Sequence, residues 1–337
     1  MEIIANERKE HNRLLNWSRR IGCALPLRLL PNPMVRGLVS SRMPFELAVE
    51  YYDEKACGMG NREYLSNVDA YLRNLVQQAG ITDCSTVGLH QPLGFGVPFS
   101  ESVFPWVLAA SQLGFHHVTL HCHVPAGGNH LSVEKYLKEV ASCVGPMRSS
   151  TRILLENLHR KTIGEFDSYP QRLEEMAEMA EMAVKAGIPL EQLGFVFDVF
   201  HMFQEDNFDT GRLCQSILTL AEGGSNSTLR NWIKVIHLCA GIGGSGHRFP
   251  FAEMPRSFMN QSQAQILDVS RVVNAISRVW GDSRLKPHVL VEAGTWPGED
   301  PVYRMVNPNY ETDEKVFEGL LKSTQELRRR ILNRSKK

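Results

Sequence analysis

Residues 193–201, LGFVFDVFH, form an apolar run that closes on Asp198 and then, three residues later, on His201. Little in this run alternates between apolar and polar residues, which is typical of a parallel strand buried on both faces. Other short apolar runs of the chain also end on an ionisable residue: His90, His121, Glu156, His237 and Glu292. Six strands that close in this way predict one shared site, where carboxylate and imidazole ligands hold divalent metal.

The strand-like runs alternate with amphipathic, helix-like segments along the chain. The runs cover residues 21–27, 45–53, 85–90, 116–123, 152–157, 193–201, 232–240 and 287–294. Eight such units predict an α/β fold, a single-domain (β/α)8 TIM barrel over residues 21–337. Residues 1–20 are expected to form an N-terminal helical extension. The alternative is a doubly wound open sheet, but no GxGxxG follows the first strand.

Composition gives the class of protein but not its activity. The chain has 337 residues, of which 43% are hydrophobic and 22% charged, as in a soluble globular enzyme. Its 37 basic and 37 acidic residues leave no overall charge, which weakens nucleic-acid binding without excluding a local basic patch. The seven cysteines are scattered, and no secretory signal or bilayer-length apolar stretch is visible. We therefore expect a cytoplasmic protein without a membrane partner; its oligomeric state stays open.

The strand-end residues differ in how strongly they point to a metal. Asp198 and His201 can both turn toward the C-terminal mouth of a barrel, although a lone Asp at that place could instead cap a helix. Glu156 and Glu292 follow apolar residues, and a buried carboxylate there needs a metal, a cation or a proton. The alternative is an ion pair with one of the arginines at positions 152, 160 and 304. His237 is expected to be a ligand first and a packed core residue second.

The remaining histidines are weaker candidates. His90 follows a strand, and His121 is the member of the HCH sequence that faces the barrel axis by register, rather than His123. His247 lies in a glycine-rich loop that could fold back over the site. The other five are expected to be surface or packing residues: His116, His117, His130, His159 and His288.

Taken together, the motifs resemble those of the xylose isomerase-like TIM-barrel superfamily, which includes sugar isomerases, epimerases and the endonuclease IV type of apurinic endonuclease. Its shared Glu, Asp, His and Glu from strands five to eight map to Glu156, Asp198, His237 and Glu292. The run DVFHM, which contains His201, resembles the DTFHM motif of ketose 3-epimerases. The segment ENLHR, ending at residue 160, resembles their ExxNR segment, although its Asn stands next to the Glu.

The endonuclease branch adds histidines on strands three and four, which His90 and His121 match. It also has a D-x-H pair after strand seven. That pair falls on Ser245 and His247 here, so its Asp is missing. This departure puts a complete three-metal cluster in doubt.

The resemblance implies two enzyme functions. The first is a divalent-metal-dependent isomerase or epimerase of a sugar, sugar phosphate or polyol, with one Mn, Mg, Co or Zn ion. There Glu156 and Glu292 are the catalytic acid and base, and His201, Arg160 and Arg248 contact the substrate or its phosphate. The second is a zinc-dependent apurinic endonuclease with two or three ions, for which DNA is the partner. A barrel that binds a ligand without turnover is a third alternative.

Overall fold

The structure is a computed structural model of the whole chain. It describes residues 16–33, 35, 43–49, 51–58, 62–91, 99–125, 130–147, 150–159, 166–222, 225–242, 247–249, 267–281, 283, 286–292 and 313–333. Most of the expected N-terminal extension, residues 1–20, therefore lies outside the described residues. Within the described part of the chain, no helix combines the length and the apolar character that crossing a membrane requires.

Eight strands form a closed barrel in the order β1-β12-β9-β8-β6-β4-β3-β2. The predicted (β/α)8 barrel is confirmed. By its internal contacts the chain divides into two compact units, Leu25–Val196 as one and Met1–Ala24 with Phe197–Lys337 as the other. The divisions fall inside β1 (Ile21–Pro26) and β8 (Leu193–Asp198).

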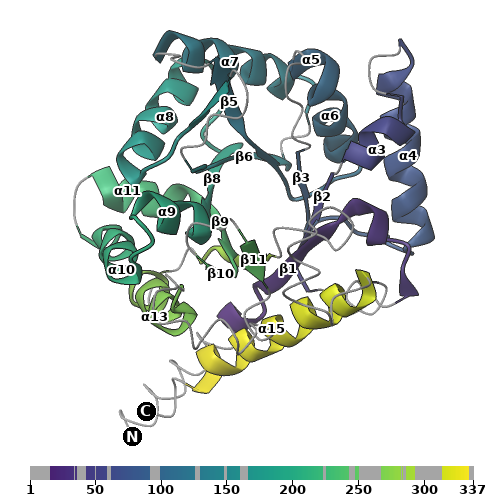
Figure 1. Cartoon of the computed structure of the whole chain (residues 1–337). Helices are drawn as coiled ribbons and strands as arrows, with labels where there is room; N and C mark the ends of the chain where they lie inside the picture. The colour runs from purple at the N-terminus through teal and green to yellow at the C-terminus, as the bar shows by residue number, and fades with distance from the viewer. Residues whose placement is uncertain are drawn as a thin grey trace, which may run out of the picture. The chain divides into compact units, whose positions relative to one another are not determined.

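The unit Leu25–Val196 contains four consecutive βα elements of the barrel. Its barrel strands are β2 (Phe45–Ala48), β3 (Val87–His90), β4 (His117–Leu120) and β6 (Arg152–Glu156). Its helices are η1 (Leu27–Leu29), α3 (Tyr51–Ala56), α4 (Tyr64–Gln78), α5 (Phe99–Ser102), α6 (Phe104–Gln112), α7 (His130–Val144) and α8 (Leu173–Lys185). Figure 1 shows α4, α6, α7 and α8 on the outer side of these strands.

The local sequence explains which face of α8 is buried and where α4 ends. In α8, Met176, Met179 and Ala183 are buried at spacings of three and four residues, so one face packs on the barrel. Helix α4 is followed by Gly80, whose φ of +70° is the left-handed conformation that glycine adopts without strain.

The barrel strands of this unit pair in parallel with one another. Glu46 aligns with Gly88, Gly88 with His117, and His117 with Arg152. Two residues further along, His90 aligns with Thr119. Because side chains alternate between the two faces of a strand, residues two apart share a face, and the register fixes which side chains meet.

The other unit supplies β9 (Ile233–Leu238) and β12 (His288–Val291), while β1 and β8 are divided between the two units. β9 and β12 pair in parallel with each other, and β12 also pairs with β1. The helices are α9 (Val199–Glu205), α10 (Thr210–Thr219), α11 (Ser225–Trp232), α13 (Val269–Trp280) and α15 (Asp313–Asn333). The antiparallel pair β10 (Ala240–Ile242) and β11 (His247–Phe249) follows β9.

The strands are shorter than the predicted apolar runs, and in three of these runs part of the sequence belongs to another helix or strand. Residues 51–53 belong to helix α3, and the run 193–201 leaves the sheet at Asp198 because Val199 begins α9. The run 116–123 divides at His121, since β5 (Cys122–Pro125) pairs with β7 (Phe166–Tyr169) in a separate antiparallel sheet. Apolar runs mark burial, and burial continues from a strand into the helix or hairpin that follows it.

Candidate metal centre

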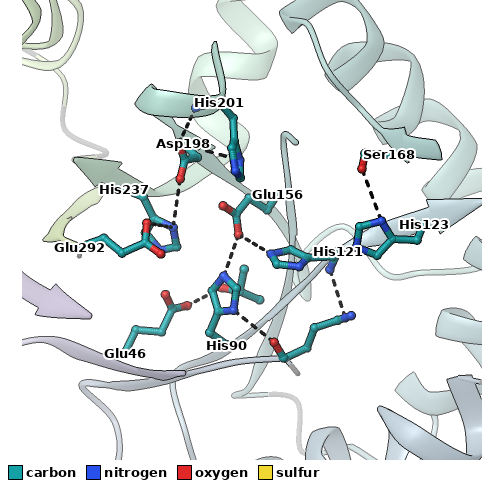
Figure 2. A network of polar contacts seen from close by, with 12 residues as sticks. Glu46, His90, His121, His123, Glu156, Ser168, Asp198, His201, His237 and Glu292 are labelled. Carbon is teal, nitrogen blue, oxygen red and sulfur yellow. Dashed lines mark hydrogen bonds and ion pairs between the residues drawn. The ribbon is translucent and has the colours of Figure 1, made fainter. Parts of the chain in front are cut away.

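Two histidines converge on one carboxylate in the unit Leu25–Val196. Nε2 of His90, at the end of β3, lies 2.9 Å from Oε2 of Glu156, and Nε2 of His121, just after β4, lies 3.0 Å from the same oxygen. The two rings meet edge to face with their centroids 4.6 Å apart. Figure 2 shows both rings pointing toward the carboxylate of Glu156.

Neighbouring residues fix the orientation of this cluster. The side chain of Gln91 accepts a hydrogen bond from the backbone N–H of His121, and the hydroxyl of Tyr136 donates to its carbonyl. Nδ1 of His90 lies 3.2 Å from the carbonyl oxygen of Gln91. That carbonyl can only accept, so Nδ1 carries a proton, and Nε2 is the nitrogen of His90 that faces the carboxylate of Glu156.

A second group of candidate metal ligands lies in the unit that contains residues 197–337. Nδ1 of His237, in β9, lies 3.7 Å from Oε2 of Glu292 and 4.0 Å from Oδ2 of Asp198. His237 and Asp198 are each 1% exposed, whereas Glu292, directly after β12, retains 18% of its side-chain surface. These separations are too wide for hydrogen bonds.

Asp198 also caps the helix that follows it. Its Oδ1 accepts the backbone N–H of His201 at 2.7 Å, and Oδ1 lies 3.8 Å from Nδ1 of the same histidine. The sequence left open whether this residue is a cap or a ligand. The structure shows the cap with one oxygen, while the other oxygen faces His237, as Figure 2 shows.

Both groups have the donor chemistry of a divalent-metal site. Zn–N and Zn–O bonds are roughly 2.0–2.2 Å, so neighbouring ligand atoms on a tetrahedral ion lie about 3.4 Å apart and two bonds span roughly 4.2 Å at most. The distances from His237 to Glu292 and to Asp198 fall between these limits. His90 and His121 lie closer to Oε2 of Glu156, at the hydrogen-bond distances of 2.9 and 3.0 Å, and these three residues offer ligand atoms that all lie within 4.8 Å of one another.

Other sequence candidates lie elsewhere or outside the described residues. His123, in β5, contacts Ser168 of β7, with Nδ1 and Oγ 3.4 Å apart. Arg160 lies outside the described residues, and so do the side chains of His247 and Arg248, whose backbone forms part of β11. The predicted roles of these three residues stay predictions.

Sequence reasoning missed Glu46, Gln91 and Tyr136. Glu46 is completely buried within the apolar sequence of β2 and contacts His117. A charged residue between apolar neighbours in a parallel strand was a signal that could have found it. Gln91 and Tyr136 hold the backbone of His121, and their sequence context carries no comparable signal.

Cys122 directly follows His121, and its burial raises the pKa of the thiol. The described cysteines form no disulfide: Cys23, Cys57, Cys84, Cys122, Cys214 and Cys239.

Comparison with known proteins adds evidence on the fold. No family model and no curated protein matches the sequence. Among solved structures, D-allulose 3-epimerase from Methylomonas sp. is 10% identical over 91% of this chain and 97% of its own, with a TM-score of 0.52. Endonuclease IV from Thermus thermophilus is 17% identical over 91% of this chain and 99% of its own, with a TM-score of 0.45.

A xylose isomerase domain protein from Planctomyces limnophilus is 13% identical over 93% of this chain and 97% of its own, with a TM-score of 0.48. Of these three, the epimerase exceeds a TM-score of 0.5, and at its low identity the likeness concerns the fold. Strand order and this likeness agree on the fold: the chain is a (β/α)8 barrel whose fold is similar to that of the epimerase.

Proposed function

We propose that this protein is a divalent-metal-dependent isomerase or epimerase of a sugar or a related polyol or sugar phosphate. The observation that carries the proposal is the spacing of His237, Asp198 and Glu292, at 3.7 and 4.0 Å, which suits shared coordination better than direct hydrogen bonding. The motif resemblance adds Glu156 as the fourth ligand. One Mn, Mg, Co or Zn ion is expected.

The chemistry follows from the residue types. A divalent ion at this site would polarise a substrate carbonyl and acidify the neighbouring C–H group. Glu156 and Glu292 exchange the proton with that carbon, one as base and the other as acid. His201 is held at the start of α9 and hydrogen-bonds a substrate hydroxyl. Arg160 and Arg248 are the proposed contacts of a further oxygen or a phosphate group.

A second function is supported by a different observation. His90 and His121 both approach Oε2 of Glu156, which provides ligands for a further ion beyond the one proposed at His237. A zinc cluster of two or three ions would suit an apurinic endonuclease, where metal-bound hydroxide attacks a phosphodiester. The balanced composition, 37 basic against 37 acidic residues, does not favour DNA as the substrate.

Metal content per chain separates these functions. The purified protein is dialysed without added metal and measured by elemental analysis. Near one ion per chain supports the isomerase or epimerase, and ketose epimerisation at C3 is then assayed first. Two to three tightly bound zinc ions would instead favour the endonuclease, and a nicking assay on abasic DNA would test it. Protein that binds no divalent ion at micromolar concentration contradicts both proposals.

A further inference from the structure

A row of polar residues crosses the strands of the unit Leu25–Val196, one layer below His90. The register aligns Glu46 of β2, Gly88 of β3, His117 of β4 and Arg152 of β6. Glu46 and His117 are completely buried. Interiors of such barrels are normally filled by branched apolar side chains, and a buried carboxylate is costly unless it has partners. Packing alone therefore does not explain why Glu46 and His117 are buried in this layer.

Glu46 reaches across β3 to contact two residues of β4. Its Oε1 lies 3.0 Å from Nε2 of His117 and accepts the hydroxyl hydrogen of Thr119. The contact passes over Gly88, where an added Cβ would lie 2.2 Å from Nε2 of His117. Glycine at this strand position leaves the space that the imidazole occupies. Two donors on one oxygen stabilise the charged carboxylate.

The donor and the acceptor of each hydrogen bond in this layer can be assigned in turn, from Arg152 to Glu46. Nη1 of Arg152 lies 3.1 Å from Nε2 of His116, and because a guanidinium only donates, that nitrogen is an acceptor. The single proton of His116 is therefore on Nδ1, which lies 2.9 Å from Nδ1 of His117. His117 then accepts at Nδ1 and carries its own proton on Nε2, which donates to Glu46. Both imidazoles are neutral, and each has one defined tautomer.

We propose that Glu46 is a positioning residue for His121, held in its charged form by the chain from Arg152 through His116 and His117. Glu46 contacts β4 at His117 and Thr119, and Thr119 stands two residues before His121. Gln91 and Tyr136 contact the backbone of His121 itself. The role in turnover rests on the proposed function, but the positioning of His121 does not.

The tautomers are tested directly by NMR of metal-free protein with 15N-labelled histidine. We expect the proton of His116 on Nδ1 and that of His117 on Nε2. Arg152→Met removes the donor to Nε2 of His116, so the proton of His116 should occupy either nitrogen, and His117, whose Nδ1 then lacks a fixed donor, should also show both tautomers. Arg152→Lys, which keeps a donor, should preserve both single tautomers. A wild-type His117 protonated on Nδ1, or on both nitrogens, overturns the proposed chain.

The positioning role is tested with Glu46→Gln, which keeps the shape of the side chain and removes its charge. We expect the 15N signals of His121 to shift in the metal-free protein, and kcat on a ketose substrate to fall at least tenfold with KM nearly unchanged. Thr119→Val, which removes one donor to Glu46, should shift the same signals less. This variant replaces Glu46→Gln in the test if Glu46→Gln does not fold. Leu137→Ala, in the buried face of α7, is the control for lost stability.

The two readouts separate this inference from the proposed function. If the His121 signals shift but no sugar is turned over by the wild type, the positioning role stands and the proposed function fails. If Glu46→Gln and Leu137→Ala lower stability alike and neither moves the His121 signals, Glu46 is a structural residue and the inference is wrong.

Discussion

Asp198 and His201 are joined by a hydrogen bond of 2.7 Å from the backbone N–H of the histidine to Oδ1 of the aspartate. The same carboxylate turns its Oδ2 toward His237 at 4.0 Å. One side chain thus ends a barrel strand, begins a helix and offers an oxygen to the candidate metal. The relationship makes the structural role and the proposed metal-binding role of Asp198 separable by mutation.

Asp198→Asn should therefore lose metal affinity but little stability. Asn is as good a helix N-cap as Asp, whereas its neutral amide is a much poorer ligand for a divalent ion. Asp198→Ala should lose both, with the free energy of unfolding of the metal-free protein lower by about 1 kcal/mol. Urea unfolding and calorimetric metal titration of both variants measure the two effects. Equal stability of the two variants would argue against the cap.

Glu292→Gln should abolish turnover while the fold is retained. Glu292 lies after β12 and keeps part of its surface exposed, so replacing its charge disturbs packing little. His288→Ala, at the other end of the same strand, is the matched control and should change activity little. The assay is epimerisation of a ketose by each variant with metal added. A fully active Glu292→Gln protein would remove this residue from the proposed site.

The variant His90→Ala should show whether the protein binds a second metal ion. His90 contacts Glu156 and lies in the cluster that contains His121, but in neither the sequence nor the motif resemblance does it belong to the four core ligands. If the protein binds one ion, metal content should remain near one per chain in this variant. If the protein binds two or three zinc ions, the content should fall by about one. Elemental analysis of wild type and variant, dialysed together, distinguishes these results.

Glu54 should make stability depend on pH near neutrality. Burial, and secondly the neighbouring Asp53, raises the pKa of this carboxyl in α3 to about 7 from an ordinary value of 4.5. The folded state therefore holds the proton more tightly than the unfolded chain does. The stability that this tighter proton binding at Glu54 contributes is complete below about pH 4.5, falls as the pH rises toward 7 and is absent above that.

Glu54→Gln, which is uncharged at every pH, should accordingly stabilise the protein at pH 8 by up to about 3 kcal/mol relative to its effect at pH 4.5. Urea unfolding of wild type and variant at both pH values measures the difference. Asp69→Asn, in an exposed pair with Arg73 on α4, is the control for removing a surface carboxylate. An equal effect of Glu54→Gln at both pH values would contradict the shifted pKa.

The sequence by itself determined the barrel and most of the candidate ligands. Parallel strands buried on both faces are almost wholly apolar, so an ionisable residue at the end of each one is conspicuous, as at Glu156, Asp198 and His237. The glycine at position 80 marked the end of α4 for a similarly local reason. Such features depend on the residue and its immediate neighbours, and they can be recognised before the fold is known.

Only the tertiary structure decided which side chains meet. The pairing of Glu46 with His117 passes over Gly88 of an intervening strand and joins residues 71 positions apart. The division of the run 116–123 at His121 depends on β5 pairing with β7, more than forty residues further on. Register between strands is set by the packing of the whole sheet, and a shift of one residue would turn every side chain to the opposite face. No local pattern contains that information.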